Sequence, residues 1–210
     1  MRPYISIDIE TTGLNRERAE VLEIGVVADD LVSPIDKLPK KSILISLPKD
    51  DYAEPFALNM NAGIFAQLLD PSVPKFNVEA AFKELYDLTL WVGQICHDWD
   101  VKNTDPKWAT NKVCFCGKNA ATFDIPVLRN FFLRHGIDQK GVEHWMKHVH
   151  HRVMDVGSMY FPRFGSVPSL VDINKITGRT EVTHRAMEDA MDVVYAVRHI
   201  MGVPVEGKKN

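Results

Sequence analysis

The sequence predicts an α/β or α+β domain built around a mixed sheet, and three observations lead to that prediction. Candidate strands open the chain, and helices alternating with short strands follow them. The length of 210 residues suits a single domain with a substantial core. A hydrophobic content of 45% and a charged content of 25% are ordinary for a soluble globular protein.

Three successive strands are predicted near the start of the chain, and this order suggests a meander. Tyr4–Glu10 places isoleucine at every second position, which is typical of a strand with a buried face. Val21–Ala28 follows a turn-rich segment, and Ser42–Leu47 is the third candidate strand. Two short strands are predicted later, over Lys112–Cys116 and Val153–Val156.

Helices are predicted where apolar residues recur with helical spacing. One long helix starts at Asn77 and keeps an apolar face as far as Ile95. The polar stretch from Asp98 to Asn111 contains a proline and is predicted to be a loop. Glycine marks the ends of several helices. The other predicted helices are Ala62–Leu69, Asp124–Arg134, Leu170–Ile176 and Arg185–Met201.

Charge and cysteine content exclude some classes of protein. A net charge of −3 argues against a generic basic nucleic-acid coat, although a local basic patch can still bind nucleic acid. Three cysteines are few and odd in number, which fits a reducing compartment better than a disulfide scaffold. No signal segment opens the chain and no apolar run approaches ~18 residues, so we expect a cytoplasmic protein that does not enter a membrane. Residues 206–210 are predicted to be a polar tail.

Two carboxylates stand two residues apart in the first strand. Asp8 and Glu10 therefore point to the same face of the sheet. A solvated edge strand is the alternative, but the isoleucines and the following strand indicate burial. Two carboxylates ~4 Å apart repel by about 4 kcal/mol at an effective dielectric constant of about 20. A multivalent cation would remove that repulsion, and oxygen ligands favour magnesium or manganese over zinc.

Further acids lie at two helix starts. Asp124 is two residues before Pro126, which suits a first helical turn, and a capping role is the alternative to a site role. Asp189 falls at the edge of the apolar stripe of the last helix. Glu188 and Asp192 are expected to face solvent.

His184 lies five residues before Asp189, and this spacing does not share a face within one continuous helix. If His184 instead ends the preceding loop, its ring can turn toward the same centre as Asp189. A helix cap or a surface position is the alternative for a lone histidine.

Two other groups of residues suggest metal sites weakly. A zinc site at Cys114 and Cys116 lacks a second pair of ligands, so buried structural thiols are expected instead. His144 and His148 have the spacing of helical zinc ligands, but HExxH is absent. A mildly basic surface that contacts phosphates is favoured there. It would draw on Lys147, Arg152 and Arg163.

Together these residues resemble the motifs of a known family. Asp8-Ile9-Glu10-Thr11-Thr12-Gly13-Leu14, then Asn119-(x)3-Phe123-Asp124, then His184-(x)4-Asp189 resemble the three exonuclease motifs of the DEDDh 3′–5′ exonucleases. That family includes DnaQ-type proofreading subunits, ribonuclease T and oligoribonuclease. The resemblance spans about residues 4 to 200 and is weak over about 71 to 112.

The resemblance implies a ribonuclease H-like fold, with a mixed sheet of about five strands and helices on both sides. It implies a single exonuclease domain over residues 1–205, with a family-variable helical and loop segment at about 71–112. Asp155 would be a structural aspartate rather than a metal ligand.

The resemblance also implies a catalytic set and two divalent cations, Mg²⁺ or Mn²⁺. Asp8 would bridge both ions, Glu10 and Asp189 would hold the hydrolytic one, and Asp124 would reach the second. Two such ions about 3.5–4 Å apart clamp an in-line displacement at phosphorus. His184 would take the proton of the attacking water, because the ordinary pKa of histidine, about 6.5, suits a base at neutral pH.

The segment Thr11–Leu14 would line the pocket for the terminal nucleotide. Leu14 would wedge against the last base, and backbone N–H groups near Thr11 and Thr12 would hold the 3′ hydroxyl. A plain Thr-Gly turn is the alternative. Phe123 would stack on a base, with a core position as its alternative, and Asn119 would support the Asp124 loop.

The sequence therefore predicts a 3′–5′ exonuclease that releases nucleoside 5′-monophosphates by a two-metal mechanism. Its expected partners are the 3′ ends of single-stranded DNA or RNA, with a polymerase as a further candidate. The first alternative is a nonhydrolytic nucleic-acid-binding or scaffold subunit on the same fold. The second is a proofreading subunit that acts only on a polymerase.

Overall fold

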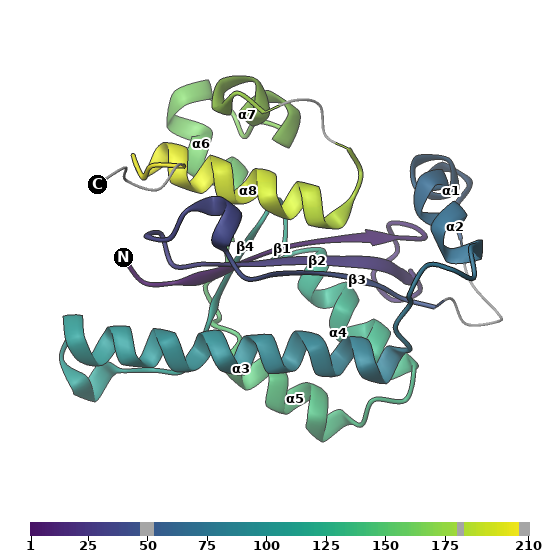
Figure 1. Ribbon diagram of the computed structural model, residues 1–210, viewed down its shortest axis with the longest axis horizontal. Coiled ribbons are helices and arrows are strands. Elements are labelled where there is room, and N and C mark those ends of the chain that lie inside the picture. Colours follow the sequence, from purple (N-terminus) through teal and green to yellow (C-terminus); the bar gives the residue numbers. More distant parts are fainter. Residues whose placement is uncertain (47–52, 180–182, 206–210) are drawn as a thin grey trace.

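The sheet at the centre of the molecule has five strands in the order β3-β2-β1-β4-β5, as a computed structural model of the chain shows (Figure 1). The structure describes residues 1–46, 53–179 and 183–205. β1, β2 and β3 form the predicted antiparallel meander, β4 pairs with β1 in parallel, and β5 pairs with β4 in parallel. The predicted mixed sheet is therefore confirmed. The strands are Tyr4–Thr11 (β1), Val21–Asp29 (β2), Lys40–Leu44 (β3), Cys114–Gly117 (β4) and Met154–Asp155 (β5).

Helices cover both faces of this sheet, as expected for an α/β protein. α3 (Val78–Asn103), α4 (Asp124–Arg134) and α5 (Gln139–His148) lie on one face (Figure 1). α6 (Val156–Phe164), α7 (Leu170–Thr177) and α8 (Ala186–Ile200) lie on the other. The short helices α1 (Pro55–Met60) and α2 (Ala62–Leu69) stand at one end of the sheet. Short 3-10 turns cover Ile35–Lys37 and Pro106–Trp108.

Alternation along β1 divides its side chains between the two helical layers. Ile5, Ile7 and Ile9 are buried in the larger core, among apolar residues of α3, α4 and α5. Ser6 points to the other face, where its hydroxyl donates to the Ala190 carbonyl of α8 at 2.7 Å. Asp8 and Glu10 share the face of Ser6, so β1 presents both carboxylates toward α8.

α3 continues from its predicted end at Ile95 to Asn103, so the prediction of a loop from Asp98 is wrong as far as Asn103. The reason is a long-range contact. Asp100 is buried and accepts two hydrogen bonds from the Arg2 guanidinium, at 3.0 and 3.2 Å. Asp100, a polar residue that suggests a loop, is thus held in the helix by Arg2, which is distant in sequence. In the described ranges, no helix is long and apolar enough to cross a membrane.

Three helices, α1, α5 and α6, lie outside the predictions. Asp138 caps α5 by accepting the N–H of Gly141 at 2.8 Å, and Asp155 caps α6 by accepting the N–H of Ser158 at 2.7 Å. The strand predicted over Val153–Val156 shortens to β5, because Asp155 already begins the turn into α6. Leu47 of the third predicted strand and the predicted tail at 206–210 lie outside the described residues.

The prediction that Asp192 faces solvent is wrong. Its side chain is buried and accepts hydrogen bonds from Arg179 Nε at 2.6 Å and from Asn174 Nδ2 at 2.5 Å. Asn174 belongs to α7, which packs beside α8 and covers this position (Figure 1). Glu188 is exposed, as predicted.

The cysteines behave as structural thiols. Cys96 and Cys116 are buried and Cys114 is half-buried, and all three are free thiols. Burial raises the pKa of each thiol, to about 11 for Cys96. Among the residues that the structure describes, no cysteine belongs to a cluster of candidate metal ligands.

Candidate functional site

Four carboxylates converge where β1, α4 and α8 meet. Asp8 and Glu10 come from β1, Asp124 from the first turn of α4 and Asp189 from the first turn of α8. The charges of the other three act on Asp8 and raise its pKa, as does the charge of Glu23 on β2. Glu10, Asp124 and Asp189 are buried, and Asp8 is half-buried. The fold thus brings together all four acids that the motif resemblance selects.

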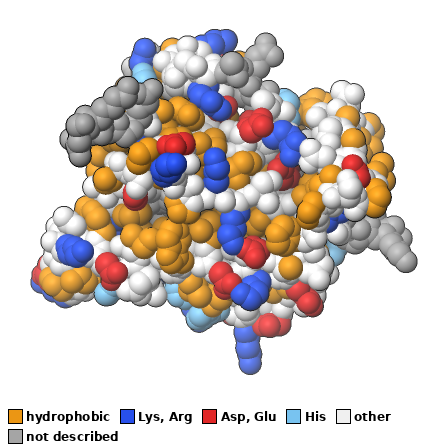
Figure 2. All heavy atoms as spheres, viewed as in Figure 1, with side chains coloured by type: hydrophobic (Ala, Val, Ile, Leu, Met, Phe, Trp, Pro, Cys, Tyr) orange, Lys and Arg blue, Asp and Glu red, His pale blue; other side chains and the backbone are white. Residues whose placement is uncertain are grey.

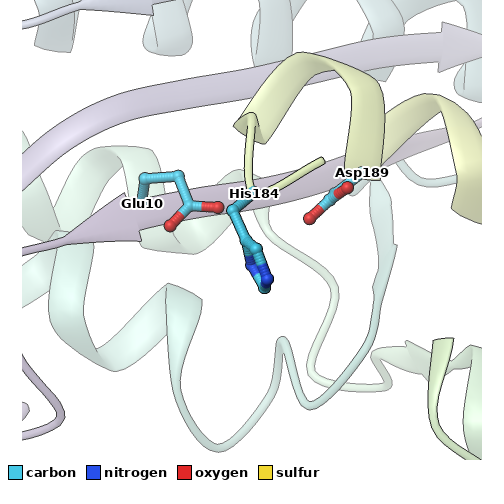
Figure 3. Close-up of side chains that lie close together, drawn as sticks. All are labelled: Glu10, His184 and Asp189. Atoms are coloured by element: carbon cyan, nitrogen blue, oxygen red, sulfur yellow. The ribbon is translucent and has the colours of Figure 1, made fainter. Parts of the chain in front are cut away.

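A histidine lies beside two of these acids. Figure 3 shows Glu10 on β1, Asp189 on α8 and His184 on the segment that leads into α8. One candidate ligand atom from each of the three lies within 4.8 Å of the others. Arg185 is the N-cap of α8, so His184 ends the preceding loop, as its spacing to Asp189 requires. Its φ of +53° turns the chain sharply before the helix.

A glycine on β2 allows α8 to approach the sheet. Gly25 pairs with Asp8 in the register between β1 and β2. A Cβ at position 25 would lie 2.1 Å from the carbonyl carbon of Ala186, which real side chains do not tolerate. The start of α8 therefore rests directly on the β2 backbone, and Asp189 lies within that same first turn.

A fifth acid, Glu23, anchors the start of α8. It is 1% exposed and lies on the same face of β2 as the glycine. Its carboxylate accepts hydrogen bonds from Arg185 Nε at 3.1 Å, from the N–H of Ala186 at 3.3 Å and from the Ser42 hydroxyl at 2.6 Å. This network holds the residue that directly follows His184.

Asp124 is the first residue of α4 and not its cap. The N-cap is Phe123, which makes no capping hydrogen bond through its side chain. The Asp124 carboxyl is buried and accepts hydrogen bonds from its own backbone N–H and from that of Ile9. Asp124 is therefore not the N-cap, and its carboxyl links the first turn of α4 to β1.

Burial is the largest cause that raises the pKa of each of the four acids. The pKa values of Glu10, Asp124 and Asp189 rise to about 7, and that of Asp8 rises well above its usual range. The charge of Asp189 adds to the rise at Glu10. Near neutral pH these carboxyls therefore retain protons unless a cation displaces them.

The donor set fits a divalent cation. Asp189 Oδ1 is buried and has no hydrogen-bond partner in the part of the chain that the structure describes. Within the same residues, the arginines near α8 pair with Glu23, Asp192 and Asp29 and not with any of the four clustered acids. Carboxylate oxygens are the ligands that Mg²⁺ and Mn²⁺ prefer.

Thr11 ends β1 and Thr12–Leu14 follow it, but some of their hydrogen-bonding groups are already used within the protein. Thr12 donates its N–H to the Glu20 carbonyl at 2.9 Å, and its hydroxyl accepts the N–H of Glu20 at 2.9 Å. The Thr12 N–H is therefore already hydrogen-bonded within the protein and is not free to hold a 3′ hydroxyl as expected. Thr11 donates its hydroxyl to the Gly13 carbonyl at 2.8 Å. Leu14 is 68% exposed, and its contact with a base stays a prediction.

Asn119 shapes the turn that presents Asp124. Its φ is +63°, and its carbonyl accepts the N–H groups of Thr122 and Phe123, both at 2.9 Å. Its own N–H donates to Asp155 Oδ2 at 2.8 Å, so Asp155 has a structural role. Phe123 is half-buried against the larger core, which supports the core alternative, and its stacking on a base stays a prediction.

Asn61 also borders the acids, although no motif selects it. It is 4% exposed, and its Nδ2 donates to the Thr11 carbonyl at 2.9 Å. Its side chain also forms a hydrogen bond with Glu10 that opposes the rise of the Glu10 pKa. Asn61 was expected from sequence to border the pocket, whereas Glu23 was missed. Its signal was the alternation of Glu23 and Gly25 with apolar residues on β2, opposite Glu10 and Asp8.

Comparison with known proteins agrees with this fold. No protein-family model matches the chain, and no curated protein matches it. E. coli Exonuclease I in complex with a dT13 oligonucleotide has a TM-score of 0.65 and 17% identity, over 97% of this chain and 42% of that chain. The zinc-ion-bound form of an E. coli Exonuclease I–ssDNA complex has a TM-score of 0.64 and 19% identity, over 95% of this chain and 41% of that chain.

A second kind of nuclease is also similar. The Mg²⁺- and Mn²⁺-bound form of Pop2p from S. pombe has a TM-score of 0.59 and 13% identity, over 100% of this chain and 86% of that chain. The chain thus spans less than half of Exonuclease I but most of Pop2p. Its fold is the ribonuclease H-like fold of these exonucleases, which confirms the fold that the motifs imply.

Proposed function

We propose that this protein is a divalent-metal-dependent 3′–5′ exonuclease that acts on single-stranded nucleic acid and releases nucleoside 5′-monophosphates. The convergence of four buried or half-buried acids beside His184 carries the proposal. Buried acids without a cationic partner are costly, so such a cluster needs a ligand that neutralises it. A metal-bound phosphodiester meets that need.

In the proposed reaction, Asp8, Glu10, Asp124 and Asp189 hold two Mg²⁺ or Mn²⁺ ions, which when bound acidify water and stabilise charge at phosphorus. His184 is exposed beside the cluster and accepts the proton of the attacking water. The bond from phosphorus to the 3′ oxygen of the preceding nucleotide breaks. The terminal nucleotide leaves with its 5′ phosphate, and the shortened strand keeps a 3′ hydroxyl.

The similar structures support the proposed ligands. Exonuclease I binds single-stranded oligonucleotides in its complexes, and the Pop2p structure contains Mg²⁺ and Mn²⁺. Because the chain is only 13–19% identical to these proteins, substrate and polarity belong to the proposal. A single domain over residues 1–205 and a polymerase partner remain predictions from the motif resemblance.

The test is degradation of a single strand labelled at one end or the other, with Mg²⁺ or Mn²⁺ added. A 3′ label should leave at once as a mononucleotide, whereas a 5′ label should remain on a ladder of shortened strands. Asp189→Asn should abolish both patterns, and the exposed acid variant Asp36→Asn should behave as the unmodified protein. Early release of the 5′ label, or full activity of Asp189→Asn, would contradict the proposal. Binding without turnover under every divalent metal would favour the nonhydrolytic alternative.

A further inference from the structure

A groove lies at the edge of the sheet, beside the start of α4. It is a cavity of about 640 Å³, bounded by α4, α5 and the segment 149–153 that leads into β5. One end is formed by Ala121 and Ile125, which stand on either side of Asp124 in the chain. Met146 and Val149 contribute to an apolar floor. We call this cavity the edge groove.

The rim of the edge groove is cationic. Lys112, Arg129 and Lys147 line it, and the single acid that lines it is Glu143. In the described ranges, none of the three cations forms an ion pair, unlike Lys41, which pairs with Glu84. This excess of positive charge occurs in a chain whose net charge is −3. On the face seen in Figure 2, by contrast, Lys and Arg are interspersed with Asp and Glu.

A second cavity, of about 370 Å³, continues the edge groove beyond His150, which lines both. Arg2 and Arg152 line this continuation. Arg2 is paired with Asp100, whereas Arg152 has no carboxylate partner among the described residues. Trp108 also lines it and is 73% exposed, and the Lys107 ammonium lies over its ring at 5.7 Å from the centroid, so an exposed indole and cations stand side by side.

The wall between the two cavities is fixed by hydrogen bonds. The N–H of Val113 donates to the His148 carbonyl at 2.7 Å, and the N–H of His150 donates to the Val113 carbonyl at 2.8 Å. The Cys114 thiol donates to the Arg152 carbonyl at 3.1 Å. These bonds tie the segment to β4, so a ligand would meet a preformed surface.

Positive charges surround His150, which lines both cavities. Burial is the largest cause that lowers the pKa of His150, and the positive charges of His151, Arg2 and Arg152 lower it further. Those three charges would also attract an anion such as a phosphate.

We propose that the edge groove and its continuation bind the single strand upstream of the 3′-terminal nucleotide, with phosphates at Lys112, Arg129 and Lys147 and a base stacked on Trp108. The inference rests on the proposed exonuclease function, which places the 3′ end at Asp124. A basic track beside exposed aromatic rings is how proteins bind single strands without sequence preference. The apolar floor offers the bases a surface that a phosphate-only site would lack.

This proposal gives the segment before β4 a role, because that segment carries Trp108 and Lys112. It also corrects the basic surface expected from sequence. Lys147 and Arg152 line the groove and its continuation, whereas Arg163 lines a separate cavity between α6 and α8. Arg163 therefore takes no part in the proposed strand path.

The first experiment compares substrates of different length. A dinucleotide fills the acidic site alone, whereas a longer strand also reaches the groove. Lys147→Glu should lower kcat/KM on a longer strand by about tenfold and on a dinucleotide by less than about twofold. Lys140→Glu is the matched control, because Lys140 is on the same helix but outside the groove. An equal loss on both substrates, or equal behaviour of the two variants, would overturn the proposal.

The second experiment measures binding without turnover. In an Asp8→Asn background, the combined change of Lys112, Arg129 and Lys147 to Ala should reduce the slope of log affinity against log salt by about 2, since each phosphate contact on a single strand contributes about 0.7. Trp108→Ala should weaken binding by about fivefold or more. Trp91→Ala is its control, because Trp91 is also exposed but lines a different cavity.

The two arms separate failure of the groove from failure of the exonuclease function. If the unmodified protein hydrolyses no strand but the groove variants weaken binding, the proposed role of the groove is supported and the proposed exonuclease function is contradicted. If hydrolysis occurs and every groove variant matches its control, the proposed role of the groove is contradicted and the exonuclease function is supported. Parallel DNA and RNA strands show which polynucleotide the groove prefers, by the presence of the 2′ hydroxyl.

Discussion

Two groups of buried acids lie near α8, and only one of them is neutralised. In the paired group each carboxylate meets a guanidinium, and the pairs are Asp29–Arg198 at 2.5 Å, Asp192–Arg179 at 2.6 Å and Glu23–Arg185 at 3.1 Å. The acid cluster of Asp8, Glu10, Asp124 and Asp189 has no such partner among the described residues. Acids of the same type therefore stand in opposite electrostatic states.

The difference indicates separate tasks. The paired acids tie elements together, as Asp29 shows: it also accepts the Tyr4 hydroxyl at 3.0 Å and so joins β1, β2 and α8. Among the described residues, no ion pair links the acid cluster to another element. Its carboxylates repel one another in the folded protein. We infer that the paired group serves stability and the acid cluster serves a ligand.

The largest expected effect is on activity, at the acid cluster. Asp8→Asn should lower hydrolysis by about a thousandfold or more, because it removes a carboxylate of the proposed metal site. The charges of the other three acids all raise the pKa of this carboxylate. The same change should raise the melting temperature of the metal-free protein by a few degrees near pH 8, because it relieves repulsion. Hydrolysis of a labelled strand and thermal unfolding measure the two effects. A variant that is both inactive and strongly destabilised would place Asp8 among the structural acids.

The paired group should show the reverse pattern. Arg198→Met leaves Asp29 buried without its cation, which should cost about 3–5 kcal/mol in the free energy of unfolding. Urea unfolding measures this loss. The double variant Asp29→Asn with Arg198→Met should recover part of it, since no unpaired charge is then left inside. A loss below about 1 kcal/mol for the single variant would contradict the division.

Arg185 links the two groups and should show a smaller, mixed effect. It pairs with Glu23 and directly follows His184, so we treat it as a positioning residue. Arg185→Ala should raise the Mn²⁺ concentration for half-maximal hydrolysis by about tenfold, as changes to residues that orient metal ligands do. Arg185→Lys should restore part of this. If stability falls while the Mn²⁺ requirement stays fixed, Arg185 is structural only.

The last prediction concerns the pH dependence of stability. The carboxyls of Glu10, Asp124 and Asp189 have pKa values of about 7 in the folded chain. They titrate near about 4 when unfolded, so the folded state binds more protons between these values. The metal-free protein should therefore lose stability as pH rises from about 4 to about 8.

Urea unfolding with a chelator at about pH 5 and about pH 8 checks this sign. Millimolar Mn²⁺ should raise stability most at the higher pH, since it binds the deprotonated acids of the folded state. Stability that increases with pH in the chelated protein would show that the acids of the cluster are already neutralised within the fold.

Local patterns in the sequence account for much of this molecule. The alternation of Ile5, Ile7 and Ile9 predicts β1 and the face that carries Asp8 and Glu10. The predicted bounds of α2 and α4 agree with the structure, and α8 begins within one residue of its prediction. These features depend on residues that are close together in the chain, so the sequence pattern alone predicts them.

Other features were beyond local patterns. Asp192 is a polar residue on an exposed-looking helical face, and only the packing of α7 buries it. Asp100 lies in the extension of α3 because Arg2, which is 98 positions earlier in the chain, pairs with it. The groove beside β5 also joins segments that are distant in sequence. In each case the deciding contact is long-range, and propensity carries no information about it.

The acid cluster shows both kinds of information at once. Local sequence patterns place Asp8 and Glu10 on one face of the first strand and Asp124 and Asp189 near helix starts, in that order along the chain. Only the tertiary structure decided which of the buried acids lack a guanidinium, because each arginine partner lies at least 13 positions away. Gly25 made the convergence sterically feasible, since any larger residue would push α8 and Asp189 away from Asp8.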